Sequence, residues 1–349
     1  MRDILKDKVI LITGGTGTFG KAFVRYVFSQ GFKLKKLIIF SRDEYKQFEM
    51  AKEYPMGEYP IRYFIGDIRD YQRLLRAFEG VDYVIHAAAM KQVPASEYNP
   101  FEAVKTNIIG AENIVNAAIE RNVKKVIAIS TDKAVNPINL YGATKLVMEK
   151  IFVAGNAYVG ARDIVFSVVR YGNVVGSRGS VIPYFLELAK NGVDEFPITD
   201  ERMTRFWITI EHGVKLVLYA LEEAVGGEIF VPKIPSMKIV DLAKAINPEC
   251  KFKIIGIRPG EKLHETLISE DEGRKTVKIK KNGFEIFVIL PQFEVRKVLS
   301  EKYRNCERMK DGFRYRSDEN DWWLSIDEMR DMIVEKFGYI PQPITSSRR

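Results

Sequence analysis

Tyr141 and Lys145 stand four residues apart in a stretch of helical periodicity, and such a pair could remove a proton from a hydroxyl group. The spacing places the phenol and the ammonium on one face of a helix. The ammonium can lower the pKa of the phenol, and a phenolate can accept a hydroxyl proton while a hydride leaves the same carbon. In a chain with 16 tyrosines, roughly one such pair arises by chance. This pair gains meaning from its position, after a strand that ends in the polar residues Ser130 to Lys133.

A glycine-rich turn, Thr13 to Gly20, follows the first apolar run and opens a helix. Gly14, Gly17 and Gly20 would allow a tight turn, a close approach of the backbone to a pyrophosphate, and close helix packing. The start of the helix adds free N–H groups and a positive dipole end. The turn therefore predicts a dinucleotide site.

The second strand ends in Ser41, Arg42 and Asp43, with Lys46 one helical turn further on. An acid at this point would accept hydrogen bonds from the ribose hydroxyl of NAD, whereas Ser41 and Arg42 can donate to a 2′-phosphate. We therefore expect NADP. In the alternative, Arg42 is a solvated charge and Asp43 binds the ribose of NAD.

The elements that must position these groups alternate along the first half of the chain. Short runs rich in Val and Ile, separated by helical patterns, are typical of a parallel sheet covered on both faces. The fold class is therefore α/β, with a doubly wound, Rossmann-like sheet whose ligands bind beyond the carboxyl ends of the strands. The predicted strands are Val9–Thr13, Leu37–Ser41, Ile61–Ile65, Tyr83–His86, Val126–Ser130 and Ile164–Arg170, and the predicted helices are Phe19–Gln30, Asp43–Tyr54, Asp70–Phe78, Pro100–Asn122 and Tyr141–Asn156.

The alternation weakens after about residue 177, where prolines separate shorter elements. We expect an NADP-binding domain over residues 1–177 and a smaller, mainly substrate-binding domain over 178–349. Residues at about 203–232 are expected to return to the first domain. The charge-rich stretch Ser269–Asn282 is expected to be surface.

Composition restricts the class of protein. The chain has 349 residues, 46% of them hydrophobic, so a large core is possible and disorder is excluded. Two cysteines, Cys250 and Cys306, provide neither a disulfide framework nor a zinc site, and no metal is expected. No apolar run is long enough to span a bilayer and the N-terminus has no secretory pattern, which predicts a cytoplasmic protein without membrane partners. The net charge of +8 admits nucleic acid, a membrane surface or a small anion as partner.

Together these motifs resemble the extended short-chain dehydrogenase/reductase family. A closer resemblance is to the inverting UDP-N-acetylglucosamine 4,6-dehydratases that start pseudaminic acid synthesis. It extends from about residue 7 to Leu290 and resumes weakly over Phe313–Leu324. The segments that carry it are Phe40–Glu44, Lys91–Pro94, Ser130–Lys133, Asn136–Asn139, Arg170–Ser180, Met203–Trp207 and Arg258–Glu265.

The resemblance implies a reaction without net redox change. Oxidation at C4 of the sugar by a tightly bound NADP, recycled within each turnover, makes the C5 proton removable, and water is then lost across C5 and C6. Tyr141, Lys145 and Thr131 would serve the C4 step, Asp132 would be the acid at the C6 oxygen, and Lys133 the base at C5. Retaining relatives that act on dTDP-glucose have an Asp-Glu pair where this chain has Asp132 and Lys133. A lysine base needs a lowered pKa, from desolvation or nearby positive charge.

The ligand sites follow from the same motifs. Bidentate guanidinium groups suit a diphosphate, and Glu261 suits ribose hydroxyls. The predicted substrate-binding residues are Lys91, Asn173, Arg178, Val181, Thr199, Arg205, Arg258 and Glu261. The predicted cofactor-binding residues are Gly14, Thr16, Gly17, Thr18, Phe19, Gly20, Ser41, Arg42, Lys46, Asp67, Ile68, Ala87, Ala88, Lys91, Asn107, Tyr141, Lys145 and Val174.

Three alternatives remain. A related dehydratase with additional epimerase activity tends to carry Met at the position of Tyr141. A nucleotide-binding regulator without turnover would lack Tyr141, Lys145, Asp132 or Lys133. A nucleic-acid-binding protein would show a basic and aromatic patch, and none is visible, so no nucleic-acid partner is expected. The family implies homo-oligomers and a UDP-sugar substrate.

Overall fold

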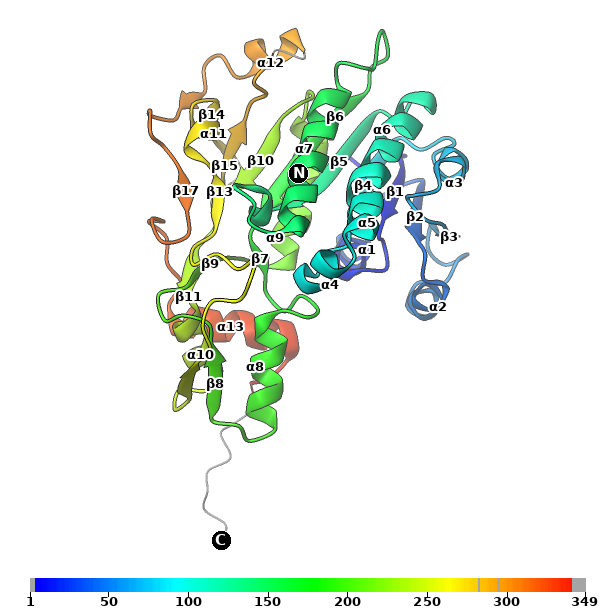
Figure 1. Cartoon of the computed structure of the whole chain (residues 1–349). Coiled ribbons are helices and arrows are strands. Elements are labelled where there is room, and N and C mark those ends of the chain that lie inside the picture. Colours follow the sequence, from blue (N-terminus) through cyan, green and yellow to red (C-terminus); the bar gives the residue numbers. More distant parts are fainter. Residues whose placement is uncertain (1–3, 282, 294–295, 341–349) are drawn as a thin grey trace.

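A single large sheet organises the molecule (Figure 1). The structure is a computed structural model that describes residues 4–281, 283–293 and 296–340. Within those residues the sheet has ten strands in the order β16-β14-β15-β10-β6-β5-β4-β1-β2-β3. The seven from β10 to β3 are parallel, which confirms the doubly wound α/β prediction. These are β1 Val9–Thr13, β2 Lys36–Ser41, β3 Ile61–Ile65, β4 Tyr83–His86, β5 Lys125–Thr131, β6 Val165–Tyr171 and β10 Ile229–Pro232.

Helices cover both faces of this sheet because its central strands are apolar on both sides, as in β1, where every residue is buried. One group packs through α6 and α7, and the other through contacts between α1 and α9 (Figure 1). The helices of the first half are α1 Thr18–Ser29, α2 Glu44–Glu53, α3 Tyr71–Ala77, α4 Val93–Tyr98, α5 Pro100–Val104, α6 Gly110–Glu120 and α7 Leu140–Gly155, with α9 Ile210–Glu223 added from the second half.

The helix predicted over Pro100–Asn122 is not continuous. A π-helical turn, Lys105–Ile109, separates α5 from α6. The turn directs the Asn107 side chain to the loop after β4, where its amide bonds both the N–H and the C=O of Met90, at 2.8 and 2.9 Å. The two hydrogen bonds of Asn107 therefore account for the interruption of the regular α-helix at this point.

A second hydrophobic cluster forms below the sheet in Figure 1. It joins α8 Val181–Lys190, β8 Glu195–Ile198, α10 Ile239–Ile246, β12 Lys251–Ile254 and α13 Ile326–Phe337. Between the cluster and the sheet, β9 Thr204–Ile208 pairs with β7 Asn173–Val174 and with β11 Ser236–Lys238. Of the segment expected to return at 203–232, α9 and β10 pack in the large sheet's layers, while β9 belongs to this small sheet.

The stretch Ser269–Asn282, expected to be surface, includes a short helix and a strand of the large sheet. It contains α11 Glu270–Gly273 and β14 Thr276–Lys281, and β14 pairs with β15 Phe284–Ile289 on the large sheet. Val277 is fully buried while Lys280 is exposed, so the lysines occupy the outer positions of a strand. Beyond it lie α12 Lys297–Lys302 and β16 Glu307–Arg308, and then β17 Tyr315–Arg316 pairs with β13 Thr266–Ile268.

No helix among the described residues is both long enough and apolar enough to cross a membrane.

Candidate active site

A cavity of about 1570 Å³ opens at the carboxyl ends of the parallel strands. Its walls come from the loops after β1, β2, β4, β5 and β6 and from the second cluster. That volume exceeds the roughly 300–1,000 Å³ of an ordinary small-molecule pocket. Nearly all the residues predicted for cofactor, substrate and chemistry line it; the exceptions are Gly20, Asn107 and Asp132.

The glycine-rich turn has the bare backbone that a pyrophosphate requires. Gly14 has a φ of +65°, and a Cβ there would lie 2.9 Å from the backbone of Ala88. A Cβ on Gly20 would lie 2.1 Å from the carbonyl oxygen of Gly15, so Gly20 serves close packing rather than contact with a ligand. Gly17 starts α1 without a side-chain cap, which leaves the first N–H groups of the helix available to an anion. These features fit a dinucleotide.

At the end of β2, Asp43 is already engaged by protein groups. Its carboxylate caps α2 by accepting a hydrogen bond from the N–H of Lys46 at 2.9 Å, and it also pairs with the Lys46 ammonium. The hydrogen bonds from Lys46 hold the pKa of Asp43 below its usual range. Arg42 is well exposed at the cavity wall, with Nη1 3.6 Å from Oδ2 of Asp67.

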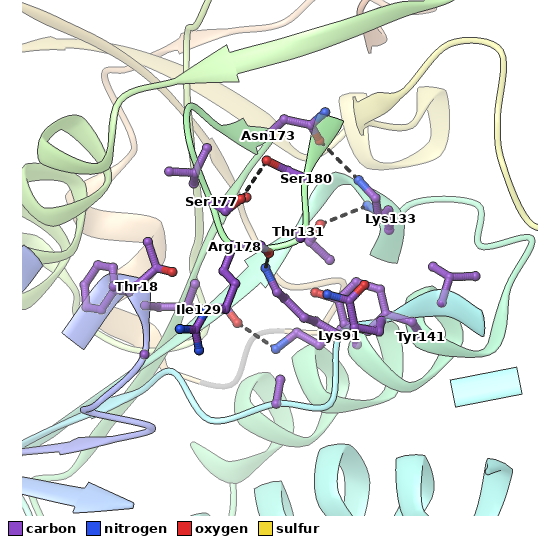
Figure 2. A pocket seen from close by; sticks show the side chains of 18 of the residues that line it. Thr18, Lys91, Ile129, Thr131, Lys133, Tyr141, Asn173, Ser177, Arg178 and Ser180 are labelled. Carbon is purple, nitrogen blue, oxygen red and sulfur yellow. Dashed lines mark hydrogen bonds between the residues drawn. The ribbon is translucent and has the colours of Figure 1, made fainter. Parts of the chain in front are cut away.

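The residues after β5 form a compact acid–base cluster, of which Figure 2 shows Thr131 and Lys133 with the contact to Asn173. The 3₁₀ turn Asp132–Ala134 brings Nζ of Lys133 to 3.0 Å from Oδ1 of Asp132, and Asn173 from β7 lies 3.3 Å away on the other side. Thr131 donates to the same Asp132 oxygen at 2.9 Å. Asp132 is fully buried, and its Oδ2 makes no hydrogen bond among the described residues. The cluster therefore holds a buried carboxylate and an amine within direct proton-transfer distance.

The charge state of Lys133 differs from the sequence-based expectation of a lowered pKa. Burial lowers the pKa of Lys133, but the carboxylates of Asp132 and Glu265 outweigh burial and raise it well above its ordinary value. These surroundings therefore favour the ammonium form of Lys133.

Tyr141 and Lys145 lie side by side on α7, as the spacing predicts, and both line the cavity. Burial raises the pKa of Tyr141 to about 12, opposed by the charge of Lys133 and by a hydrogen bond with Thr131. Burial lowers the pKa of Lys145 to about 8, opposed by Glu149. The Lys145 ammonium donates to the carbonyl oxygen of Ile129 at 2.7 Å. The charge of Lys133 thus acts on the Tyr141 phenol, a contribution that the spacing did not predict.

The substrate end contains the predicted arginines in different states. Arg178 and Arg258 line the cavity, and Lys91 donates to the carbonyl oxygen of Arg178 at 3.1 Å. Arg205 is buried, and its guanidinium donates to the carbonyl oxygens of residues 204, 262 and 263. Most donors of Arg205 are therefore engaged by the main chain. Glu261 faces Arg258 at 4.0 Å and accepts from Thr199 at 3.4 Å.

Sequence reasoning assigned no chemistry to Glu265 or Lys262, although both line the cavity. Oε1 of Glu265 lies 3.7 Å from Nζ of Lys133, and its Oε2 lies 3.8 Å from Nζ of Lys262. The sequence offered one signal for Glu265, namely that it is an acidic residue within Arg258–Glu265, a segment that carries the family resemblance. Its partner Lys133 is far away in sequence, so the contact could not be read from spacing.

Comparisons with known proteins agree with this geometry. Residues 10–286 match the family model described as polysaccharide biosynthesis protein. A UDP-N-acetylglucosamine 4,6-dehydratase (inverting) from Campylobacter jejuni subsp. jejuni serotype O:23/36 (strain 81-176) is 53% identical over 341 residues, which cover 96% of this chain and 100% of the relative. A UDP-glucose 4-epimerase from Rickettsia canadensis (strain McKiel) is 46% identical over 77% of this chain and 80% of its own.

Solved structures show the same fold. The X-ray structure of Pen from Bacillus thuringiensis is 39% identical, covers 95% of this chain and 99% of its own, and superposes with a TM-score of 0.84. The dTDP-glucose 4,6-dehydratase DesIV from Streptomyces venezuelae, solved with NAD and TYD bound, is 21% identical over 73% of this chain and 86% of its own, with a TM-score of 0.65.

Proposed function

This chain belongs to the family of inverting UDP-N-acetylglucosamine 4,6-dehydratases, and we propose that it catalyses that reaction with NADP. The product would be a UDP-2-acetamido-2,6-dideoxy-L-hexos-4-ulose. The observation that carries the proposal is the Asp132–Lys133 pair, a buried acid and an amine 3.0 Å apart beside Thr131 and Tyr141. An elimination across C5 and C6 needs a base at C5 and an acid at the C6 oxygen, and this pair can supply both.

The cofactor fits the glycine-rich turn and the end of β2. When bound, NADP would supply the two-electron chemistry, accepting a hydride from C4 and returning it to C6. Arg42 and Ser41 would contact the 2′-phosphate. The engagement of both Asp43 oxygens by Lys46 supports NADP, because it leaves that carboxylate fewer acceptor positions for a ribose hydroxyl.

The C4 step belongs to Tyr141. As a phenolate, hydrogen-bonded to Thr131, it would take the C4 hydroxyl proton as the ketone forms. With a pKa of about 12, the phenol needs help to lose its own proton, and the charge of Lys133 lowers that pKa. The ketone in turn makes the C5 proton acidic.

The elimination can begin with the ion pair seen in the structure. Transfer of one proton from Nζ of Lys133 to Oδ1 of Asp132, over 3.0 Å, produces a neutral amine and a carboxylic acid. The amine then removes the C5 proton, the electron pair forms the C5=C6 double bond, and the C6 oxygen leaves as water with the proton of Asp132. The original ion pair is restored, so a raised pKa on Lys133 is compatible with its role as base. Return of the hydride to C6 would then be accompanied by addition of a solvent-derived proton to the opposite face of C5, which gives the L configuration.

Further parts of the proposal rest on the resemblance. The product would enter pseudaminic acid synthesis and protein glycosylation, in the cytoplasm, and the enzyme would be a homo-oligomer. The substrate diphosphate would lie against Arg178 and Arg258, with Lys91 and Asn173 near the sugar.

The decisive experiment incubates the purified protein with NADP and UDP-N-acetylglucosamine in D₂O and follows the product by NMR. We expect a 4-keto-6-methyl sugar with inverted C5 that carries deuterium at C5. Retained configuration, or a product changed only at C4 as an epimerase would give, contradicts the proposal. Lys133→Met should abolish deuterium entry at C5, and undiminished exchange in that variant would remove Lys133 from its role as base.

A further inference from the structure

Glu265 is a buried carboxylate in the cavity wall for which the reaction outlined above has no use. The residue is 2% exposed, and its Oε2 makes no hydrogen bond among the described residues. Burial of a carboxylate without hydrogen bonds is costly unless opposite charges surround it. The charged groups around Glu265 must therefore offset the cost of burying its carboxylate.

Three cations surround the Glu265 carboxylate. Lys133 and Arg205 approach Oε1 at 3.7 and 3.8 Å, and Lys262 approaches Oε2 at 3.8 Å. Arg205 and Lys262 have other partners, because they donate to main-chain carbonyl oxygens at 2.7 to 3.1 Å and 2.5 Å respectively. Apart from Asp132, the polar partners of the Lys133 ammonium in the described part of the chain are the amide oxygen of Asn173 and the carboxylate of Glu265. Of the three contacts that Glu265 makes with cations, the one with Lys133 is therefore the one that can affect the reaction.

The main chain of Glu265 is fixed from a distant part of the sequence. Its N–H donates to Oγ of Ser317 at 3.0 Å, and its carbonyl oxygen accepts from the N–H of Ser317 at 2.9 Å. Ser317 follows β17, which pairs with β13 directly after Glu265. The carboxylate is therefore held at a defined place relative to Lys133.

We propose that Glu265 is a positioning residue, whose carboxylate holds the Lys133 amine in the elimination site and stabilises its charged form once the C5 proton has been taken up. When the C5–H bond breaks, positive charge appears on Nζ of Lys133, 3.7 Å from Oε1 of Glu265. Opposite charges at that distance stabilise the ammonium both in the resting ion pair and after the C5 proton has been taken up, so Glu265 acts on turnover by holding Nζ in place rather than by driving one step. The role in catalysis rests on the proposed function, whereas the effect on Lys133 does not.

The ionisation of Lys133 depends on every charged group around it. Asp132 and Glu265 favour its charged form, Arg205 opposes it, and Tyr141, Lys91 and Lys262 interact with it more weakly. Removal of the Glu265 charge leaves Asp132 as the one carboxylate facing it in the described structure. The pKa of Lys133 must then fall, and it must fall more than after loss of a carboxylate elsewhere in the cavity.

The first test measures Lys133 itself without substrate. Competitive labelling with a trace acylating reagent across a pH series, read by peptide mass spectrometry, gives the pKa of Lys133 in the wild type and in Glu265→Gln. We expect a decrease of about one pH unit or more. The matched control is Glu261→Gln, whose carboxylate faces Arg258 and Thr199 in the same cavity and should leave Lys133 unchanged. An equal pKa in the wild type and Glu265→Gln overturns the proposal.

A second variant covers the case in which Glu265→Gln does not fold. Glu265→Asp keeps the charge but withdraws it by one methylene group, so the pKa of Lys133 should fall by a smaller amount. An unchanged value in a folded Glu265→Asp protein, with Glu265→Gln unfolded, likewise overturns the proposal.

The second test uses turnover of UDP-N-acetylglucosamine. Glu265→Gln should lower kcat at least about tenfold, change KM less than about threefold, and move the alkaline limb of the kcat profile to lower pH. If Glu265 only packs against its neighbours, Glu265→Gln will lower stability and leave the alkaline limb at the same pH. That result would contradict the role in catalysis. If the wild type makes no product but the labelling shift occurs, the proposed function fails while the electrostatic pairing stands.

Discussion

Lys133 and Asp132 are neighbours in sequence, and their proximity in the site was predictable from that alone. The raised pKa of Lys133 was not, because beside Asp132 it depends on Glu265, which reaches the cluster only through tertiary folding. The same holds for Tyr141. Its helix position follows from spacing, but burial and Lys133 set its pKa, and Lys145 donates to Ile129 instead. Residue identities and local spacing were thus readable, whereas the electrostatic environment required the fold.

Arg42 should decide between the two nicotinamide dinucleotides. Its exposed guanidinium at the end of β2 would bind the 2′-phosphate that NAD lacks. Arg42→Ala should weaken NADP binding about tenfold or more and leave NAD within about twofold. Calorimetric titration of both cofactors measures this, with Arg25→Ala, an exposed arginine paired with Glu211, as control. Equal losses for both cofactors would count against the assignment.

His86 should make the protein less stable in acid. It is buried, its Nδ1 lies 2.8 Å from Oγ1 of Thr13, and burial, aided by the charge of Lys145, lowers its pKa to about 3. Below pH 6.5, His86 binds a proton in the unfolded chain but stays neutral in the folded chain until the pH approaches 3. This contribution to stability is present above pH 6.5 and is lost as the pH falls toward 3, by about 1.4 kcal/mol per pH unit.

Urea denaturation of the wild type and His86→Gln between pH 4.5 and 8 isolates this effect. The difference in unfolding free energy should be constant above pH 7, where it serves as the internal control, and should shift against the wild type below pH 6. A difference independent of pH over the whole range would contradict the prediction.

At the scale of elements, a buried ion network connects α7, which carries Tyr141 and Lys145, to two other parts of the fold. Arg170 on β6 binds Glu149 on α7 at 2.6 and 2.9 Å, and Glu272 on α11 at 2.8 and 3.0 Å. Arg170 and Glu149 are almost completely buried. Glu149 stands one turn after Lys145 and opposes the lowering of its pKa. The network therefore holds α7 against β6 and α11 and keeps a carboxylate one turn from Lys145.

Arg170→Met should destabilise the protein by about 3–5 kcal/mol, because two carboxylates would remain buried without their common partner. Arg314→Met, in the more exposed pair with Glu319, should cost less than about 1 kcal/mol. Urea denaturation at pH 7 compares the two variants. Similar small losses in both would show that the buried network contributes little.

The elements of the first half were predictable because the strands are continuous apolar runs separated by helical patterns; β1 and β3 match their predicted bounds. The π-helical turn at Asn107 was not predictable, since it depends on hydrogen bonds between Asn107 and the loop after β4. Nor was β14, whose lysine-rich sequence resembles surface until its pairing with β15 is known. The division at residue 177 remains a prediction.

On the scale of the whole molecule, the surplus of positive charge concentrates where ligands would bind. Ten Lys or Arg side chains and four Asp or Glu side chains line the cavity in the described part of the chain. A cavity of this sign attracts a dinucleotide and a nucleotide sugar and raises their local concentration.

Salt should therefore weaken substrate binding more than it slows chemistry. Between 50 and 500 mM NaCl, the KM for UDP-N-acetylglucosamine should rise about threefold or more while kcat stays within about twofold, because the Debye length shrinks below the dimensions of the cavity. Steady-state kinetics over this range is the measurement, and Arg178→Ala should show a shallower dependence. A KM that is flat with salt would contradict the electrostatic account.

The bond pair between Ser317 and Glu265 has a consequence for how the enzyme is made. A ribosome delivers β1 to β6, the glycine-rich turn and the Asp132–Lys133 pair first, and that half can begin to fold as it emerges. The segment that holds Glu265 is synthesised more than fifty residues after Glu265 itself. A growing chain would thus acquire its dinucleotide site early and complete its elimination site only near the end of translation.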